Sequence, residues 1–365
     1  MILELTAAAS LGAWIYLLTA RGGFWKIKIP LKPAHSGAGK SVCVIIPARN
    51  EESVVGQAVQ SLRPWRVIVV DDHSSDRTAA IAAEAGAEVI SAGPLPAGWS
   101  GKLWAISEGL KRARSLQPDY LLFTDADIIH APGNIAELVA RAETENLDLV
   151  SLMVKLRCRS LAETLLIPAF VFFFFMLYPP GWVSRRDRKT AAAAGGCILI
   201  RPSALDRIGG VESIRGEIID DCALARAVQR TGGGIWLGVT NDTCSIRDYT
   251  TFGEIRAMIS RTAFAQLRHS TLLLLGTILG MAIIYLAPPL LPFTRNPLAS
   301  VLGFGAWILM TIAYIPALRF YGRSIAWAPL LPLTALFYIS ATIDSAIAYW
   351  SGRGGVWKDR VQDER

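Results

Sequence analysis

Short apolar runs alternate with helix-like segments along the first two thirds of the chain. The runs are rich in Val, Ile, Leu and Phe and end at polar or turn-forming residues, as strands buried on both faces do. Strands are predicted at residues 42–46, 67–70, 88–90, 121–130, 148–155, 191–200 and 235–239. Helices are predicted to end near residue 62 and to cover residues 77–85, 102–115, 133–145 and 222–229. This alternation predicts an α/β fold with a doubly wound sheet.

Polar and acidic residues follow three of the predicted strands: residues 47–51, the pair Asp71 and Asp72, and the pair Asp125 and Asp127. In a doubly wound sheet, ligands bind beyond the carboxyl ends of the strands. Asp125 and Asp127 are two positions apart, so both carboxylates face the same way on an extended chain. Two carboxylates suit Mg²⁺ or Mn²⁺, which keep coordination positions for waters and phosphates. The pattern predicts a nucleotide site with a divalent cation.

Each acidic pair also has a simpler explanation. Asp71 and Asp72 are typical of a turn that caps the next helix. Asp220 and Asp221 could simply begin the helix at 222–229, where carboxylates favour the helix dipole. Lys102 stands at a helix start, where a lysine is more often solvated than bound to a ligand. Only the occurrence of all the acidic pairs at strand ends favours the site.

Four long apolar stretches predict a multi-pass membrane protein. Of the 365 residues, 52% are hydrophobic and 18% charged, which is too apolar for an ordinary soluble domain. Residues 1–21 are predicted to form an uncleaved anchor, because the basic residues follow the apolar run and place the next segment in the cytoplasm. Residues 22–40 form a linker. Residues 269–350 hold three further spans, at 271–293, 299–320 and 326–350, each long enough to cross ~30 Å of hydrocarbon.

A fifth apolar segment, residues 161–182, interrupts the α/β pattern. If it crossed the membrane, the later strands would lie on the opposite side from Asp125. An interfacial or re-entrant segment is therefore predicted, with the aromatic run 170–175 facing lipid. Four plain spans would place the basic tail, residues 351–365, outside the cell, whereas its basic residues favour the inside. Either one apolar segment is re-entrant or the count of spans is wrong.

Charge and cysteine usage exclude several other functions. The net charge of +7 is modest, and the basic residues flank the apolar segments, which indicates contacts with membrane lipids rather than nucleic acid. The five cysteines lack CxxC spacing and indicate small buried residues in a reducing compartment. Gly39-Lys40-Ser41 resembles the end of a P-loop, but it precedes a strand, and Ala34 stands where the first glycine is required.

Four motifs together carry a family resemblance: IIPARNEE at 45–52, VVDDHSSD at 69–76, TDAD at 124–127 and IDD at 219–221. In order and spacing they resemble the family 2 inverting glycosyltransferases, over about residues 41–268. The resemblance implies the GT-A fold, a Rossmann-like, doubly wound mixed sheet. The anchor, the segment 161–182 and the C-terminal spans resemble the membrane-bound, ceramide-glucosyltransferase-like branch. The layout of the whole chain is most similar to hopanoid-biosynthesis-associated bacterial enzymes.

The resemblance implies a donor site for a nucleotide sugar. Pro47 and Arg49 would line the nucleobase, with Glu51 in the same loop, and Asp72 would hydrogen-bond a uracil ring. Lys102 would approach the donor from the following helix.

The resemblance also implies roles for the later acidic residues. Asp125 and Asp127 match the DXD motif that contacts the ribose and the metal, with Asp127 the direct ligand of Mg²⁺ or Mn²⁺. Asp221 matches the general base that takes the proton of the acceptor hydroxyl, and Asp220 stands where many relatives carry Glu. A single base and no covalent intermediate would invert the anomeric centre.

One departure separates the chain from the polymer-forming relatives, which carry a Gln-x-x-Arg-Trp motif before the C-terminal spans. Here Gln266 and Arg268 have a different spacing, and no Trp follows. We therefore expect transfer of one sugar, from a UDP-sugar to a lipid acceptor such as a hopanoid, at the cytoplasmic face of the bacterial inner membrane. The alternatives are a nucleotidyltransferase on the same scaffold, which would not need Asp221, and an inactive scaffold or lipid-transport component.

Overall fold

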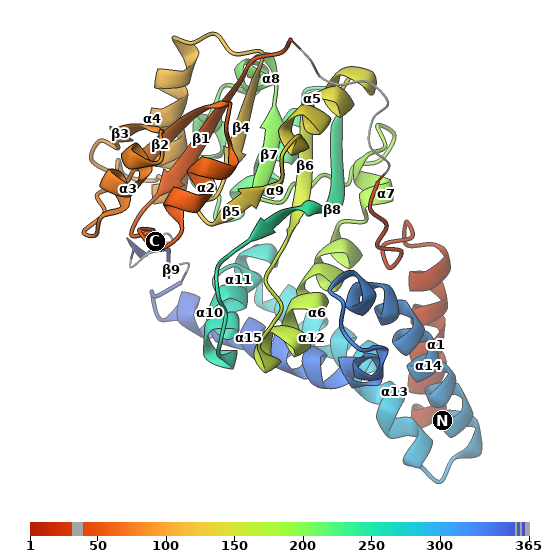
Figure 1. The fold of residues 1–365 in the computed structure, drawn as a ribbon. Coiled ribbons are helices and arrows are strands. Elements are labelled where there is room, and N and C mark those ends of the chain that lie inside the picture. Colours follow the sequence, from red (N-terminus) through yellow and green to blue (C-terminus); the bar gives the residue numbers. More distant parts are fainter. Residues whose placement is uncertain (31–38, 355, 358–359, 362–365) are drawn as a thin grey trace.

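The structure is a computed structural model that describes residues 1–30, 39–354, 356–357 and 360–361. Parts of the predicted linker and of the predicted basic tail therefore lie outside the described residues. A mixed eight-stranded sheet with helices on both faces occupies one end of the molecule, and long apolar helices extend from the other (Figure 1). The short strands β9 (Val356–Trp357) and β10 (Arg360–Val361) pair antiparallel near the end of the chain.

The eight-stranded sheet has the order β3-β2-β1-β4-β7-β6-β8-β5. The strands β3, β2, β1 and β4 are parallel, β7 runs antiparallel to both of its neighbours, and β8 is parallel to β6. The mixed, doubly wound sheet predicted from the sequence is therefore confirmed. Its strands are β1 (Val42–Ala48), β2 (Arg66–Asp71), β3 (Glu88–Ser91), β4 (Tyr120–Thr124), β5 (Ile128–His130), β6 (Leu149–Lys155), β7 (Cys197–Ile200) and β8 (Ile235–Ser245).

Alternate residues of β1 enter two separate cores, because successive side chains of a strand point to opposite faces. Val44 and Ile46 pack on one face, whereas Ile45 packs on the other. The α4 helix approaches β1 closely at Gly109, where an added Cβ would lie 2.6 Å from Ile45 Cγ2. The first face carries α2 (Val55–Ser61), α3 (Thr78–Glu84) and α5 (Asn134–Thr144), and the second carries α4 (Gly101–Arg114), α8 (Pro202–Ile208), the 3₁₀ turn η1 (Val211–Ile214) and α9 (Asp220–Arg230).

The prediction of one strand over residues 121–130 is wrong. The β4 strand ends at Thr124, the chain turns, and β5 pairs antiparallel with β8 at the far edge of the sheet. The buried ring of His130 joins the two ends of this turn, since its Nε2 lies 3.0 Å from Thr124 Oγ1. Burial lowers the pKa of His130 to about 4, so the ring is neutral at physiological pH. Asp125 and Asp127 therefore do not share one face of a strand.

Within the described residues, five helical segments are long and apolar enough to cross a membrane. They are α1 (Ile2–Thr19), Leu161–Val183, Thr271–Phe293, α14 (Pro297–Phe320) and Ile325–Trp350. Leu161–Val183 consists of α6 (Leu161–Leu177) and α7 (Pro180–Val183). Thr271–Phe293 is a continuous helix of changing pitch, made of α12 (Thr271–Met281), η2 (Ala282–Leu286), α13 (Ala287–Leu290) and η3 (Leu291–Phe293). Ile325–Trp350 consists of η4 (Ile325–Leu330) and α15 (Leu331–Trp350).

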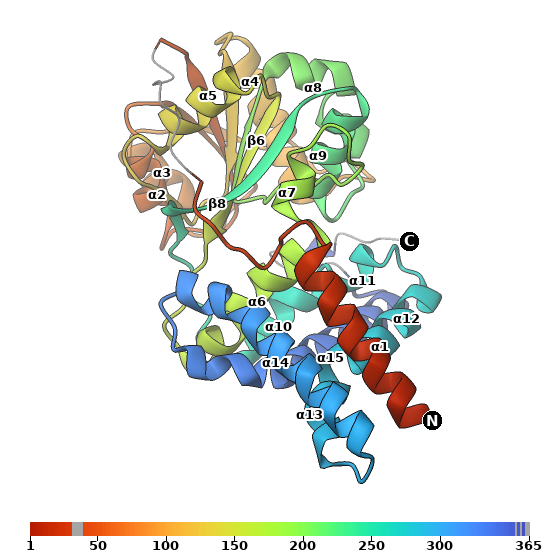
Figure 2. The same cartoon turned by 90° about the vertical axis from the view of Figure 1, so that its right-hand side faces the viewer.

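Three of these segments, α1, Thr271–Phe293 and α14, run side by side away from the sheet (Figures 1 and 2). Trp14 Nε1 donates a hydrogen bond of 2.8 Å to the carbonyl of Ile284 midway along them. At the end remote from the sheet, Asn296 Nδ2 donates to Glu4 Oε1 at 2.9 Å. We call these three segments the helical arm.

The strands on either side of α6 in the chain, β6 before it and β7 after it, are neighbours in the sheet. A crossing that would leave the two ends of α6 on opposite sides of a membrane is incompatible with that pairing. The prediction that the aromatic run 170–175 faces lipid is wrong for most of its rings. Phe172 and Phe173 are 1% and 8% exposed and make edge contacts with Tyr314 of α14 and Tyr338 of α15.

The α15 helix lies across the underside of the sheet domain, transverse to the helical arm (Figures 1 and 2). It packs against α10 (Phe252–Ser260) and α11 (Ala263–Gln266), which follow β8 in the chain. Asp344 of α15 pairs with Arg256 of α10, and Ser345 Oγ accepts a hydrogen bond of 3.0 Å from the backbone N–H of Phe264. Asp344, the acidic residue of this apolar segment, therefore helps to hold α15 against the sheet domain.

The first turn of α6 is fixed by Glu163, whose side chain has no exposed surface. Its Oε2 accepts hydrogen bonds from the backbone N–H groups of Arg159 and Ser160, at 2.6 and 2.8 Å. Its Oε1 accepts a third from the N–H of Tyr249, at 3.0 Å, in the segment that leaves β8. One buried carboxylate therefore joins a helix start to a distant loop.

Replacing Glu163 with Gln should destabilise the protein by about 1–3 kcal/mol, because the amide nitrogen would face backbone N–H donors that need an acceptor. The matched control is Glu254→Gln, since Glu254 forms the same capping box with Thr251 on the exposed start of α10. The unfolding temperature in detergent, followed by tryptophan fluorescence, should fall much further for Glu163→Gln. Equal shifts for the two variants would contradict a joining role for Glu163.

Candidate active site

A cleft lies beyond the carboxyl ends of β1 and β4. It brings together five of the residues singled out in the sequence, Pro47, Lys102, Asp125, Asp220 and Asp221, although they come from four separate segments of the chain. The rest of its lining is mostly apolar: Leu103, Ile106, Phe123, Thr124, Gly195, Ile198, Val211, Ile214 and Leu224. Arg49, Glu51, Asp72 and Asp127, which the sequence also singled out, do not line it.

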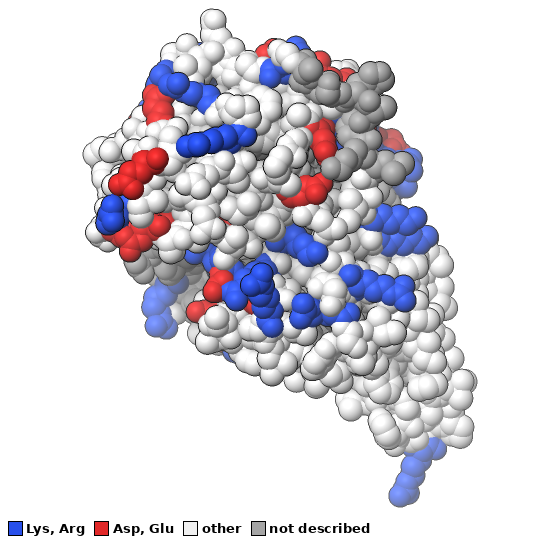
Figure 3. Space-filling model, viewed as in Figure 1, with Lys and Arg blue, Asp and Glu red and all other residues white. Residues whose placement is uncertain are grey.

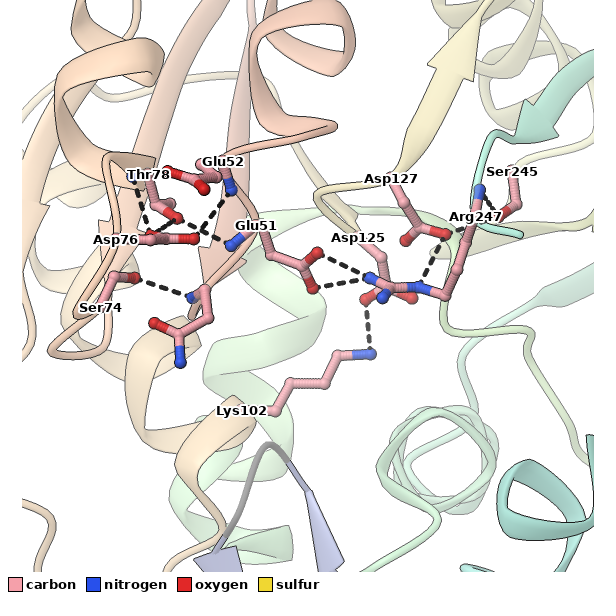
Figure 4. Close-up of polar contacts among 11 residues, drawn as sticks. Glu51, Glu52, Ser74, Asp76, Thr78, Lys102, Asp125, Asp127, Ser245 and Arg247 are labelled. Carbon is pink, nitrogen blue, oxygen red and sulfur yellow. Dashed lines mark hydrogen bonds and ion pairs between the residues drawn. The ribbon is translucent and has the colours of Figure 1, made fainter. Parts of the chain in front are cut away.

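Lys102 lies between the two acidic pairs of this cleft. It stands in the first turn of α4, where Ser100 caps the helix by accepting from the N–H of Leu103. Its Nζ forms an ion pair of 2.8 Å with Asp125 Oδ1 (Figure 4). Burial acts against the charged ammonium, but the carboxylates of Asp125 and Asp220 outweigh it and raise the pKa of Lys102. The lysine is therefore a fixed cation.

Asp221 lies at the start of α9, beside Gly195. Its Oδ2 accepts a hydrogen bond of 2.8 Å from the Gly195 N–H, and its Oδ1 accepts one of 2.7 Å from the N–H of Cys222. Burial and the charge of Asp220 raise the pKa of Asp221 to about 6, against the lowering effect of Lys102. The helix-start explanation for this pair is thus correct, and it does not conflict with a chemical role. A carboxylate with such a pKa is ionised at neutral pH and is a better proton acceptor than an ordinary aspartate.

Arg247 was not singled out from the sequence, yet it joins two of the predicted site residues. Its Nη2 donates to both carboxylate oxygens of Glu51, at 2.7 and 2.8 Å, and its Nε lies 3.4 Å from Asp127 Oδ2 (Figure 4). Ser245 Oγ donates a further hydrogen bond of 2.5 Å to the same oxygen of Asp127. No signal in the sequence marks Arg247, because its partners come together only through the pairing of β5 with β8.

The loops after β1 and β2 interlock. Arg49 Nη1 donates a hydrogen bond of 2.6 Å to the carbonyl of Asp72, and the N–H of Glu51 donates one of 2.7 Å to Thr78 Oγ1. Asp76 accepts from the N–H of Glu52 in the same way (Figure 4). These motifs therefore have a structural role, and Asp72 has no exposed surface. Contacts of Arg49 and Asp72 with a nucleobase remain predictions.

Comparison with known proteins points to one enzyme family. Residues 43–209 match the sequence profile described as glycosyl transferase family 2. This region is similar to family 2 glycosyltransferases. It contains the motif loops after β1, β2 and β4, together with Lys102.

The curated relatives that match share only part of their length with this chain. The 4,4'-diaponeurosporenoate glycosyltransferase of Staphylococcus haemolyticus is 44% identical over 95 residues, which are 24% of each chain. Its counterpart from Staphylococcus aureus strain RF122 is 38% identical over 94 residues, with the same coverage. The chain therefore spans about a quarter of the length of these relatives.

Similarity to a solved structure extends over nearly the whole chain. A mannosyltransferase from Pyrobaculum calidifontis, determined in complex with GDP-Man and Mn²⁺, superposes with a TM-score of 0.54. The superposition covers 94% of this chain and 98% of the other at 17% sequence identity. At that identity the comparison establishes the fold, which is the Rossmann-like GT-A sheet followed by long apolar helices.

The donor set of the glycosyltransferase domain fits a divalent cation that also binds a substrate. Among the described residues, no group of three or more His, Cys, Asp or Glu side chains is placed to hold a metal alone. Mg²⁺ and Mn²⁺ are commonly held by one or two carboxylates together with substrate phosphates. Asp125 and Asp127 supply two carboxylates, and each already contacts a cationic side chain. They would hold the metal, which would offset negative charge on a bound diphosphate.

Lys102→Met should raise the pKa of Asp221 above about 6, because it removes the cation that opposes the effects of burial and Asp220. Infrared titration of the carboxyl band, corrected by subtraction of the Asp221→Asn protein, measures this pKa directly. Lys111→Met is the matched control, since Lys111 lies on the same helix but pairs with Glu108 at the surface. An unchanged Asp221 titration in Lys102→Met would show that the lysine does not act on it.

Proposed function

We propose that the protein is a membrane-bound inverting glycosyltransferase that moves one sugar from a nucleotide sugar, a UDP-sugar, to a lipid acceptor such as a hopanoid. The observation that carries the proposal is the cleft in which Lys102 lies between Asp125 and Asp221. The family match of residues 43–209 supports glycosyl transfer. Relatives named for 4,4'-diaponeurosporenoate support an acceptor more apolar than a soluble sugar.

The residues of the site would have different roles in the proposed reaction. Asp221 would take the proton of the acceptor hydroxyl as the oxygen attacks the anomeric carbon, and the bond from that carbon to the diphosphate would break. Lys102 would offset charge on the leaving diphosphate, beside a Mg²⁺ or Mn²⁺ ion held by Asp125 and Asp127. Because one base acts once, without a covalent intermediate, the sugar configuration inverts.

The wall around Asp221 supports an apolar acceptor. Val211 and Ile214 from η1 and Leu224 from α9 line the cleft there. Apolar side chains favour an acceptor that is itself apolar next to its hydroxyl group, because both surfaces leave water on binding. Gln266 does not line the cleft, and it donates a hydrogen bond of 2.7 Å to the hydroxyl of Tyr178. This supports transfer of a single sugar.

The assay is release of nucleoside diphosphate by the full chain in lipid nanodiscs, with UDP-, GDP- and dTDP-sugars and with bacterial lipid fractions as acceptors. Turnover should require Mn²⁺ or Mg²⁺, stop with EDTA and rise with one lipid fraction. Asp221→Asn should lower the rate by about 10²–10⁴-fold while nucleotide binding persists. In the wild type, the rate should increase as pH rises through about 6, because only the ionised Asp221 accepts a proton.

Each competing function has its own outcome in this assay. Release of pyrophosphate that is unaffected by Asp221→Asn would indicate nucleotidyl transfer instead. Binding of nucleotide without turnover of any donor and acceptor pair would indicate an inactive scaffold. Near-normal transfer by Asp221→Asn would refute the assignment of the base.

We also propose that the catalytic domain lies on the cytoplasmic side of the bacterial inner membrane, with the helical arm as three spans. Lys and Arg side chains gather where the sheet domain meets the helices, whereas the arm is nearly free of charge (Figure 3). Arg21, Lys26, Arg319 and Arg323 flank the arm at its sheet end. This asymmetry supports a cytoplasmic sheet end.

The α15 helix would then lie along the membrane surface rather than cross it. Its polar residues contact the sheet domain, through Asp344 and Ser345, whereas Leu333, Leu336 and Ile347 are exposed. A helix with one face on protein and an exposed apolar face on the other side suits the interface. An odd number of spans, with the N-terminus outside, would leave the basic tail in the cytoplasm. The position of the tail would then agree with its positive charge.

Two reporters fused after Arg365 should therefore both indicate the cytoplasm. A fluorescent protein should be fluorescent there, and alkaline phosphatase should be inactive. The matched control is the same pair of reporters fused after Arg295, between η3 and α14, where the signal should reverse. A periplasmic signal at Arg365 would instead support four plain spans.

A further inference from the structure

Arg247 occupies a position between carboxylates that come from different strand ends. Glu51 follows β1 and Asp127 follows β4, and both side chains are buried, with residue exposures of 7% and 8%. The guanidinium contacts both carboxylates (Figure 4). Two buried carboxylates in one place require a cation, since an unpaired buried charge is strongly unfavourable. The guanidinium thus stands where a metal ligated by Asp127 would need to bind.

We propose that Arg247 is an exchangeable cation of the donor site. It neutralises Glu51 and Asp127 while no donor is bound, and it moves to the donor's diphosphate when a divalent cation replaces it at Asp127. This inference rests on the proposed function, because it assumes that a nucleoside diphosphate binds in the cleft.

Hydrogen bonds hold the backbone on both sides of Arg247, so the proposed exchange moves the side chain alone. Ile246 donates a hydrogen bond of 3.0 Å from its N–H to the carbonyl of Asp127. Two residues after Arg247, the N–H of Tyr249 donates to the buried Glu163, and the Tyr249 carbonyl accepts from Ser160 Oγ at 3.1 Å. The Arg247 side chain itself is 32% exposed, so it borders open space.

The chemistry of the guanidinium suits both positions. Arginine carries five N–H donors in a planar fork, which matches carboxylates and phosphates alike. In its present position it uses Nη2 and Nε on carboxylates. A divalent cation at Asp127 would repel a guanidinium left in contact with the same carboxylate, and the repulsion is strong at such short distance. The diphosphate offers the displaced cation a new partner of opposite charge.

The first test is titration of Mn²⁺ alone into the purified full chain in nanodiscs, by calorimetry or by loss of the free-ion electron paramagnetic resonance signal. Arg247→Gln removes the competing cation, so Mn²⁺ should bind about tenfold more tightly than to the wild type. Arg247→Lys keeps a positive charge and should bind Mn²⁺ less tightly than Arg247→Gln. Unchanged or weaker Mn²⁺ binding by Arg247→Gln would overturn the exchange.

The second test is titration of UDP and of GDP at saturating Mn²⁺. The nucleotide that binds the wild type should bind Arg247→Gln about tenfold more weakly, because its diphosphate loses the guanidinium. Equal affinity would show that the side chain does not move to the diphosphate. If neither nucleotide binds the wild type, the proposed function fails, whereas the Mn²⁺ titration still decides whether Arg247 competes with the metal.

Arg157→Gln is the matched control for both titrations. Arg157 pairs with Asp248, the residue next to Arg247, so the variant removes a neighbouring arginine without touching Glu51 or Asp127. Its Mn²⁺ and nucleotide affinities should equal those of the wild type. Unfolding temperatures of all the variants exclude loss of the fold as the cause of a change, and Arg247→Lys tests the proposal should Arg247→Gln unfold.

Discussion

Clustering of several carboxylates at one end of the sheet, two of them buried, is the constraint on which the rest of the structure depends. Glu51, Asp125, Asp127 and Asp221 come from different strand ends and a helix start, and at close range they would repel one another. Lys102 and Arg247 offset that charge, one from the start of α4 and the other from the segment after β8. Arg247 contacts Glu51 and Asp127, which come from separate segments, so these ion pairs also join the loops that follow β1 and β4.

The sheet imposes a second constraint, on the apolar helices. Because β6 and β7 are neighbours in the sheet, the chain has to return to the sheet domain after α6. Its aromatic rings then become part of the protein core and pack on Tyr314 and Tyr338. Hydropathy alone cannot distinguish this helix from a span, because a buried helix and a membrane helix have the same composition.

Much of the fold was predictable from the sequence, because the apolar runs and the polar motifs that follow them depend on residues close together in the chain. The mixed sheet and the cleft that unites Pro47, Lys102, Asp125 and Asp221 follow from those signals. The turn between β4 and β5 was missed because residues 121–130 contain no glycine, so the apolar run appeared continuous.

Arg247 was missed for a different reason, since its role depends on the pairing of β8 with β5. That contact joins segments far apart in the chain. No local pattern marks an arginine whose partners arise only from the tertiary fold, and the same holds for the buried contact of Glu163 with Tyr249.

The site has an ionic end beside the cleft and an apolar end within it, and this division agrees with the two substrates of the proposed reaction. Around Glu51, Asp127 and Arg247 the side chains are ionic, which favours a metal and a diphosphate. Around Asp221 the walls are apolar, which favours a lipid. Glu163 links the ionic end to α6, because the loop that carries Arg247 is hydrogen-bonded to the first turn of that helix. The α6 helix, which packs on α14 of the helical arm, is therefore also connected to the loop that carries Arg247.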